Sequence, residues 1–297
     1  MEGGTVQFGI NIANHRDLMS KRYIVETARL VEDLGLDSVW IPDHIIVPTA
    51  VEERYGPVYY EPLTVLAYLA GVTTRVQIGT TVLIIPYRHP MVTAKAVASI
   101  DQLCDGRLIL GVGAGWAEAE FQILRLSFAE RGRITDEYLR IMQTLWQQDL
   151  PHFSGQYYTF ADFLFAPKPV QQPAPPIWVG GSSGAALRRA AEFGVAWHPN
   201  NPALETLPRD LQRLHALCQE RVRVPVAFCP RFTVQVNSPV AAERHGLAGS
   251  VAQIIDALLQ VKALGATHVV LSTQTNDLAQ FRQEVETLAT EVLPRVR

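Results

Sequence analysis

Short apolar segments alternate with amphipathic, helix-like segments eight times along this chain of 297 residues. The apolar segments are rich in valine, isoleucine and leucine, which is typical of parallel strands that are buried on both faces. Strict alternation of strand and helix predicts a parallel sheet, and eight such units in about 250 residues predict a closed (β/α)8 barrel, the TIM-barrel fold. We expect the strands at residues 6–12, 36–41, 76–85, 107–112, 177–179, 195–198, 225–236 and 267–272.

The pattern predicts one α/β domain, residues 1–297, with insertions at the C-terminal face of the strands. No internal repeat and no low-complexity segment interrupts it. The longest insertion spans about residues 149–175 and is rich in proline and in aromatic side chains, which favours a packed segment over a flexible linker.

Composition excludes several classes of function. The formal net charge of −3 gives no sign of binding to nucleic acid or to an acidic membrane surface, and no apolar run is long enough to cross a bilayer. The first ten residues lack the basic and apolar segments of a signal peptide, and the three cysteines are scattered, as in reduced intracellular proteins. We therefore expect a cytoplasmic protein.

The active site of such a barrel lies at the C-terminal ends of its strands. Asp43 and His44 follow the second strand and are the best acid–base candidates, because histidine titrates near neutrality and a neighbouring carboxylate can orient or charge it. The histidine spacings are not those of a metal site, so we expect no metal. Other residues at strand ends are Asn11, Asn14, Thr81, Gly113, Gly115, Trp116, His198, Asn200, Arg231 and residues 272–274.

A strand, a glycine-rich turn and a helix follow one another at residues 177–194. Gly180 and Gly181 end the strand, and Ser182 or Ser183 caps the helix. This helix has no acidic residue before Glu192, so its N-terminal N–H groups and partial positive charge are suited to an anion. A phosphate site and an ordinary strand-to-helix turn explain the segment equally well.

The same turn matches G-x-S-x-G, the nucleophile pattern of α/β-hydrolases. The rest of that pattern is missing, since no HGGG-like segment precedes the turn and His268 begins the last strand instead of following it. The glycines at positions 111, 113 and 115 resemble a dinucleotide fingerprint, but Trp116 stands where its third glycine belongs. Close backbone packing is the simpler explanation for at least one of these glycines.

Four segments together resemble the bacterial luciferase-like flavin and deazaflavin oxidoreductases. They are LGLDSVWIPDH, RVQIGTTVLIIPYRHP, LCDGRLILGVGAGW followed by FAERGRITDEYL, and PPIWVGGSSGAALRRAA followed by GVAWHP. Their order and spacing cover nearly the whole chain, and the Asp-His pair is similar to the branch that uses the deazaflavin coenzyme F420.

The resemblance implies a (β/α)8 barrel that holds the cofactor ring at the strand ends. It implies a phosphate site at Gly180, Gly181, Ser182, Ser183 and Gly184, and a non-prolyl cis peptide at Thr81-Val82 that supports the ring. It further implies that Asp43 contacts the cofactor and that His44 stands beside the hydride-transfer site. The family is often dimeric, so we expect a homodimer.

The chain departs from the sugar-phosphate dehydrogenases of that branch. Trp116 stands where they have a glutamate, and Pro48 where they have a tryptophan, which argues against a sugar phosphate. We expect Trp116, His198 and the aromatic insertion to form the wall of a pocket for an apolar or aromatic small molecule. The main hypothesis is an F420-dependent oxidoreductase. The alternatives are a monooxygenase that uses reduced FMN and O2, a serine hydrolase, and a non-catalytic flavin-binding protein.

Overall fold

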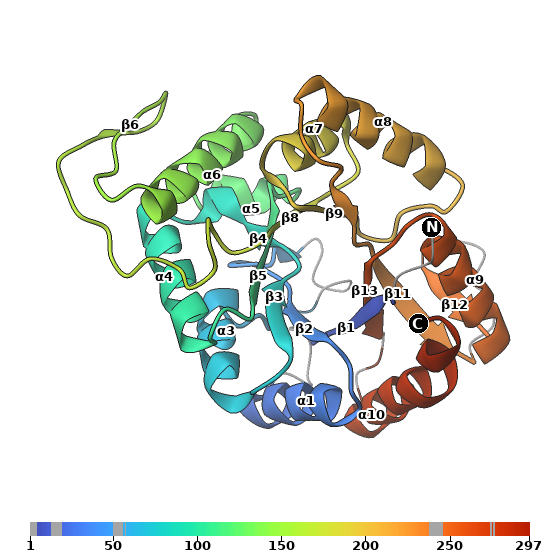
Figure 1. Ribbon diagram of the computed structural model, residues 1–297. Coiled ribbons are helices and arrows are strands. Elements are labelled where there is room, and N and C mark those ends of the chain that lie inside the picture. Colours follow the sequence, from blue (N-terminus) through green and yellow to red (C-terminus); the bar gives the residue numbers. More distant parts are fainter. Residues whose placement is uncertain are drawn as a thin grey trace.

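Parallel strands surround one axis and helices cover their outer side in the computed structural model (Figure 1). The structure describes residues 5–12, 20–49, 56, 58–237, 246–273, 275 and 277–297, so Asn14 and residue 274 lie outside the described part. The strands of the large sheet are β1 Gln7–Asn11, β2 Ser38–Ile41, β3 Gln77–Thr80, β4 Leu83–Ile84, β5 Leu108–Gly113, β8 Ile177–Gly180, β9 Ala196–His198, β10 Ala227–Phe228, β11 Arg231–Val236, β12 Leu247–Gly249 and β13 His268–Thr273.

The sheet closes on itself through residues 227–236. The amide of Cys229 donates to the carbonyl oxygen of Trp197 in β9, at 2.9 Å, and the amide of Val270 in β13 donates to the carbonyl oxygen of Pro230, also at 2.9 Å. One segment therefore pairs with the strands on both of its sides, which confirms the (β/α)8 barrel. Two predicted strands are each broken in two, at residues 81–82 and 229–230, and β12 was not predicted.

Eight helices of the described part alternate with the strands, as predicted. They begin where the sequence supplies caps: the side chain of Ser20 accepts from the amide of Tyr23, and Ser250 with Gln253 forms a capping box. The bounds are α1 Lys21–Asp33, α3 Pro62–Val72, α4 Pro90–Leu103, α6 Arg131–Gln147, α7 Gly184–Phe193, α8 Leu207–Glu220, α9 Val251–Ala263 and α10 Leu278–Thr287, with a shorter α5 Glu118–Ile123 after β5. None of the described helices is long and apolar enough to cross a membrane.

The interior of the barrel is filled by side chains below its C-terminal end. Trp40 and Trp178 contact each other there, with ring centroids 4.7 Å apart. Trp40 fits because glycines of β1 and β3 lie against its ring: a Cβ on Gly9 would lie 2.5 Å from the indole nitrogen, and one on Gly79, its partner in β3, 2.6 Å from the ring. The packed interior leaves the C-terminal mouth as the place where a ligand can enter.

The insertion at residues 149–175 packs along the outer side of α4 and α6 (Figure 1). It contains the hairpin β6 Phe153–Ser154 and β7 Thr159–Phe160. The buried carboxylate of Glu137 in α6 accepts from the amides of residues 156, 157 and 158. The ring of Tyr158 contacts those of His89 and Tyr138. The expectation that this insertion forms the substrate wall is therefore wrong: its aromatic side chains pack on helices, and it follows a helix, not a strand.

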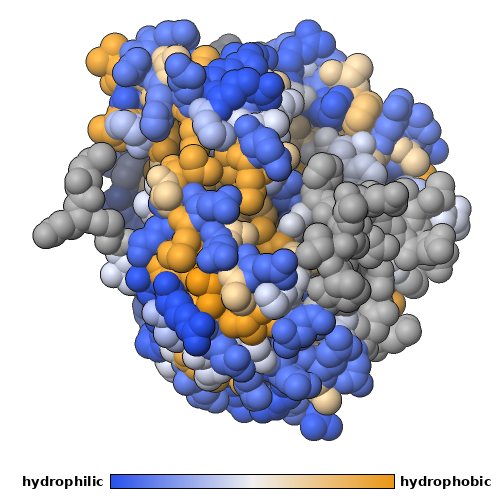
Figure 2. All heavy atoms as spheres, turned by 90° about the vertical axis from the view of Figure 1, so that its right-hand side faces the viewer, coloured by the Kyte–Doolittle hydropathy of each residue, from blue (hydrophilic) through white to orange (hydrophobic). Residues whose placement is uncertain are grey.

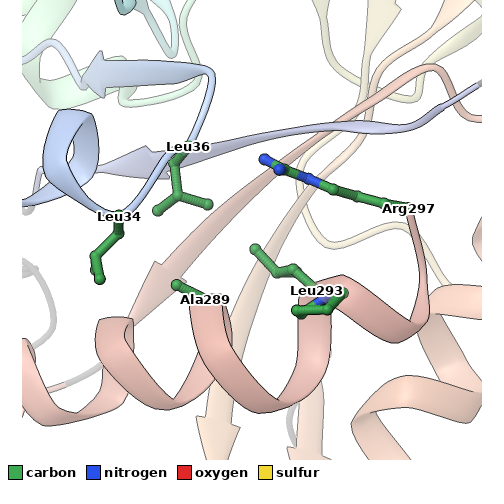
Figure 3. Close-up of a pocket in the computed structure, with 6 residues that line it drawn as sticks. Leu34, Leu36, Ala289, Leu293 and Arg297 are labelled. Carbon is green, nitrogen blue, oxygen red and sulfur yellow. The ribbon is translucent and has the colours of Figure 1, made fainter.

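A small cavity lies at the opposite end of the barrel from the mouth. Its volume is about 190 Å³, and it is lined by Leu34, Leu36, Ala289, Leu293, Pro294 and Arg297 (Figure 3). Leu34 and Leu36 stand before β2 begins, at the N-terminal end of the strands. On the face that Figure 2 shows, which is the side of the barrel that carries α9, hydrophobic residues form a band. None of the predicted site residues lines the cavity.

Candidate active site

His44 lies at the mouth of the barrel, where the chain leaves β2. Its Nδ1 lies 2.8 Å from Oε2 of Glu120 in α5. The other carboxylate oxygen of Glu120 accepts from the amides of Ile45, at 2.7 Å, and Ile46, at 3.0 Å. The hydroxyl of Tyr87 donates to Oε2 at 2.9 Å. Glu120 is completely buried and joins α5 to the loop after β2.

The partner of His44 was not the one predicted. Asp43 is its neighbour in the chain, but the Asp43 side chain pairs with Arg88: Oδ2 accepts from Nη1 at 2.6 Å and Oδ1 from Nη2 at 2.8 Å. Oδ2 also accepts from the amide of Ile84, at 2.8 Å. Burial disfavours the Arg88 cation, but hydrogen bonds and attraction from Asp43, with Glu61 adding to them, raise its pKa. Asp43 thus holds the end of β4 and Arg88 in place.

The peptide bond Thr81-Val82 is cis, as the resemblance implied. Glycines surround the side chain that it directs inward: a Cβ on Gly113 would lie 2.6 Å from Cγ2 of Val82, and one on Gly180 2.8 Å from Cγ1. A Cβ on Gly111 would lie 1.9 Å from the carbonyl oxygen of residue 80. Close packing therefore explains the glycines that resembled a dinucleotide fingerprint.

His198 lies beneath this cis peptide. Its Nε2 is 2.9 Å from Oγ1 of Thr81, its Nδ1 is 2.5 Å from the carbonyl oxygen of Cys229, and its ring stacks on Trp40. Burial, helped by the charge of Arg231, lowers its pKa to about 4, so the ring is neutral near pH 7. His198 is only 2% exposed. The expectation that it lines the substrate pocket is not met; it supports Thr81.

Arg231 and Asn11, two of the predicted strand-end residues, add polar groups to the mouth. Arg231 donates to the carbonyl oxygen of Thr81, at 2.9 Å, and to Oγ of Ser272, at 3.0 Å. Asn11 lies next to Ser272, because Ile10 is opposite Leu271 in the register of β1 and β13. The Asn11 side chain is buried, and Oδ1 accepts from no described residue. A buried carbonyl without a donor costs about 1–3 kcal/mol, so a ligand donor there would be favourable.

The glycine-rich turn after β8 has the predicted form. Gly181 has φ +94°, a backbone conformation that favours glycine. The side chain of Ser183 caps α7 by accepting from the amide of Ala186, and Ser182 is exposed. Arg213 of α8 reaches the same turn: a Cβ on Gly184 would lie 2.8 Å from its Nη2. A cation beside a helix N-terminus that lacks acidic residues in its first turn is suited to a phosphate.

Aromatic side chains stand beside His44. The ring of Tyr59 meets the imidazole edge-to-face, with centroids 5.1 Å apart, and the ring of Trp116 does so at 5.8 Å. Trp116 is 50% exposed, unlike the tryptophans inside the barrel. The group that can exchange a proton is therefore bordered by two aromatic rings.

Two other chemistries lack support at this mouth. No cluster of three or more metal-ligating side chains occurs among the described residues. No hydrogen bond joins Ser182 to a histidine in the part of the chain that the structure describes, since the buried histidines 198 and 268 are bonded to Thr81 and Ser38. Among the residues that the structure describes, the matched G-x-S-x-G pattern therefore has no histidine bonded to its serine.

Residues 3–289 match the family model described as luciferase-like monooxygenase. An uncharacterized protein from Mycobacterium tuberculosis is 32% identical over 229 residues, 73% of this chain and 76% of that protein. An F420-dependent glucose-6-phosphate dehydrogenase from Amycolatopsis mediterranei is 35% identical over 58% of this chain and 51% of its own. An FMNH2-dependent dimethylsulfone monooxygenase from Pseudomonas putida is 32% identical over 53% of this chain and 44% of its own. The matched regions thus span about half of each of the two named enzymes.

Solved structures share the fold across the whole chain. The monooxygenase RslO1 from Streptomyces bottropensis superposes with a TM-score of 0.85 at 19% identity, covering 98% of this chain and 100% of that one. An F420-dependent secondary alcohol dehydrogenase in complex with an F420–acetone adduct has a TM-score of 0.83 at 20% identity, covering 99% and 100%. At these identities the likeness shows a common barrel.

Proposed function

The chain belongs to the luciferase-like monooxygenase family, and we propose that it is an oxidoreductase that transfers a hydride between coenzyme F420 and a small organic substrate. The observation that carries this proposal is the Asp43-His44 pair at the barrel mouth, with His44 held by Glu120. A titratable imidazole at a strand end of this barrel can donate or accept the proton that accompanies hydride transfer.

The residues of the mouth fit a cofactor with a planar polar ring and a phosphate tail. The buried Oδ1 of Asn11 accepts from no described residue, which suits a ligand N–H group. At the other side, the N-terminus of α7 and the nearby Arg213 suit a phosphate. F420, when bound, supplies the hydride acceptor or donor.

Each group of residues then has a separate task. Gly180, Gly181, Ser182, Ser183 and Gly184 hold the phosphate. The cis peptide of Thr81 and Val82 supports one face of the ring, with His198 and Arg231 bonded to Thr81 from below. Asp43 keeps Arg88 and β4 aligned beside the ring, and we propose that it also contacts the cofactor. His44 moves the proton.

We propose an apolar or aromatic substrate. Trp116 and Tyr59 present ring faces beside His44, so a substrate carbon next to the imidazole would lie against aromatic surface. We further propose that the protein acts as a cytoplasmic homodimer, and its net charge of −3 suits neither nucleic acid nor an acidic membrane as a partner.

The second candidate is a monooxygenase that uses reduced FMN and O2. The similarity to the dimethylsulfone monooxygenase favours it, and the α7 turn would hold the phosphate of either cofactor. Oxygen consumption with reduced FMN, measured with and without the protein, separates the two candidates.

Titration of the cofactor-free protein with F420 and with FMN tests the assignment. We expect tight binding of F420. Tight binding of FMN with none of F420 would overturn the assignment. A His44→Ala variant is expected to bind F420 as the wild type does but to turn over at least about 100-fold more slowly. A His215→Ala variant, changed at an exposed position of α8, is the matched control.

A further inference from the structure

The hydrogen-bond shell of Glu120 is unusually complete for a single side chain. Its two oxygens accept from four donors: Nδ1 of His44, the hydroxyl of Tyr87, and the amides of Ile45 and Ile46. All four belong to segments outside α5. Glu120 is completely buried, so bulk water does not compete for these bonds.

The carboxylate is ionised in this setting. Burial opposes the charge, but the hydrogen bond from His44, the amides of Ile46 and Ile45, and the attraction of the imidazole outweigh burial and hold the pKa of Glu120 below its usual range. An ionised carboxylate can only accept hydrogen bonds. The proton between His44 and Glu120 must therefore sit on Nδ1 of the imidazole.

Helix α5 keeps the carboxylate in place. Phe121, the next residue, is completely buried and contacts Tyr87 and Phe128, with centroid distances of 4.9 and 5.4 Å. Gly115 permits this approach, since a Cβ there would lie 2.7 Å from the Phe121 ring. The backbone that carries Glu120 is thus anchored independently of His44.

We propose that Glu120 is the positioning residue of the active site: it fixes the proton of His44 on Nδ1, so that Nε2 is the atom that exchanges a proton with the bound ligand. Only the expected effect on turnover rests on the proposed function; the tautomer of His44 does not. In the neutral imidazole, a donor at Nδ1 leaves Nε2 as the acceptor, and in the cation the nearby carboxylate stabilises the added charge.

Aromatic side chains adjoin His44 among the described residues. Tyr59 and Trp116 meet its ring edge-to-face. Burial and the charge of Glu120 raise the pKa of Tyr87, which therefore stays a neutral donor. Asp43, adjacent in the chain, is paired with Arg88, which also contacts Glu61. Glu120 is thus the carboxylate that bonds directly to the imidazole among the described residues.

The decisive test measures the His44 tautomer directly, by ¹⁵N NMR of the histidine-labelled protein without cofactor. The wild type is expected to show the Nδ1–H form. A Glu120→Gln variant keeps the shape, but its amide can donate as well as accept, so we expect both tautomers to be populated. Glu118→Gln, an exposed change in the same helix, is expected to leave the wild-type form. An Nε2–H tautomer in the wild type would overturn the proposal, even if no variant folds.

Kinetics supply the second readout. With F420, Glu120→Gln is expected to lower kcat by about 10–100-fold, with little change in KM, because the proton of the imidazole is no longer fixed on Nδ1. An unchanged tautomer in this variant would show a merely structural role. If the tautomer changes in Glu120→Gln but even the wild type does not turn over F420, Glu120 positions the proton of His44 as proposed and the proposed function is refuted.

Discussion

Two histidines buried inside the barrel make the stability of this protein depend on pH. His198 is bonded to Thr81 and to the carbonyl oxygen of Cys229, and His268 is bonded to Ser38, at 2.7 Å. Burial lowers the pKa of His198 to about 4, with the charge of Arg231 adding to it. Burial likewise lowers the pKa of His268 to about 3, with His198 contributing. Both rings are neutral in the folded protein near pH 7.

The sign follows from proton linkage. Below the unfolded pKa of 6.5, the unfolded chain binds protons at both histidines and the folded chain does not, so stability falls as pH falls. Each group contributes up to about 1.4 kcal/mol per pH unit, and the pair therefore up to about 2.8 kcal/mol per unit at about pH 5, between the unfolded and folded pKa values. By pH 4 the loss is on the order of several kcal/mol, a large part of the stability of a typical domain.

Urea unfolding at a series of pH values from about 7.5 to 4.5 measures this slope. His268→Gln removes one of the two groups, so the slope in this range should fall to about half, whatever the change in absolute stability. His215→Gln, on the exposed side of α8, should leave it unchanged. A free energy of unfolding that stays flat from about pH 6.5 to 4.5, or an equal slope in His268→Gln, would refute the reasoning.

Three further changes probe the mouth and the insertion. Gly113→Ala places a Cβ 2.6 Å from Val82, so we expect the free energy of unfolding, measured in urea, to fall by about 1–3 kcal/mol and the cofactor to bind more weakly. The control is Gly71→Ala in α3, where open space surrounds the added Cβ; this change should leave the stability unchanged or raise it. Arg213→Ala should weaken F420 binding about 10-fold or more, because a charged phosphate contact is lost. Titration measures the affinity, and Arg209→Ala is the control. Equal affinities of the two variants would show that Arg213 does not contact the phosphate. Glu137→Ala should destabilise the protein by about 1–3 kcal/mol, because the amides of residues 156, 157 and 158 lose their acceptor. Its kcat should stay within about two-fold of the wild type, because the insertion lies outside the mouth. A large fall in kcat would contradict that placement.

The barrel and the location of its mouth were predictable from the sequence. Hydrophobic patterning and strand–helix alternation are local properties of the sequence. Eight such units with parallel strands commonly form one fold, the closed (β/α)8 barrel. The same local properties predicted the turn at Gly181 and a cap at Ser182 or Ser183, of which the structure has Ser183, because glycine and serine have conformational preferences of their own. The cis bond at Thr81-Val82 came from the family resemblance.

The partners of the site residues were not predictable in the same way. Asp43 and His44 are adjacent, so their side chains were expected to act together, but adjacent side chains in extended chain point in different directions. Asp43 bonds to Arg88, and His44 to Glu120, which is 76 residues away. That contact depends on where α5 lies over the mouth, which is a tertiary property. The only sequence signal for this partner was a glutamate shortly after a barrel strand, at position 120.

The predicted places of the insertion and of His198 in the substrate pocket also depended on tertiary structure. Aromatic composition indicated a buried segment at residues 149–175 but not which surface it covers, and Glu137 ties it to the outside of α6. His198 stands at a strand end, yet its side chain faces the packed interior, where Thr81 and Cys229 occupy both ring nitrogens.

The cofactor that remains bound when the protein is purified from a host that makes both F420 and FMN tests the central claim most directly. Mass spectrometry of the released ligand identifies it without knowledge of the substrate. We predict F420 at close to one molecule per chain, and loss of that cofactor from a variant altered at Gly181. FMN as the bound cofactor, with F420 absent, would contradict the account and leave the monooxygenase as the function of this barrel.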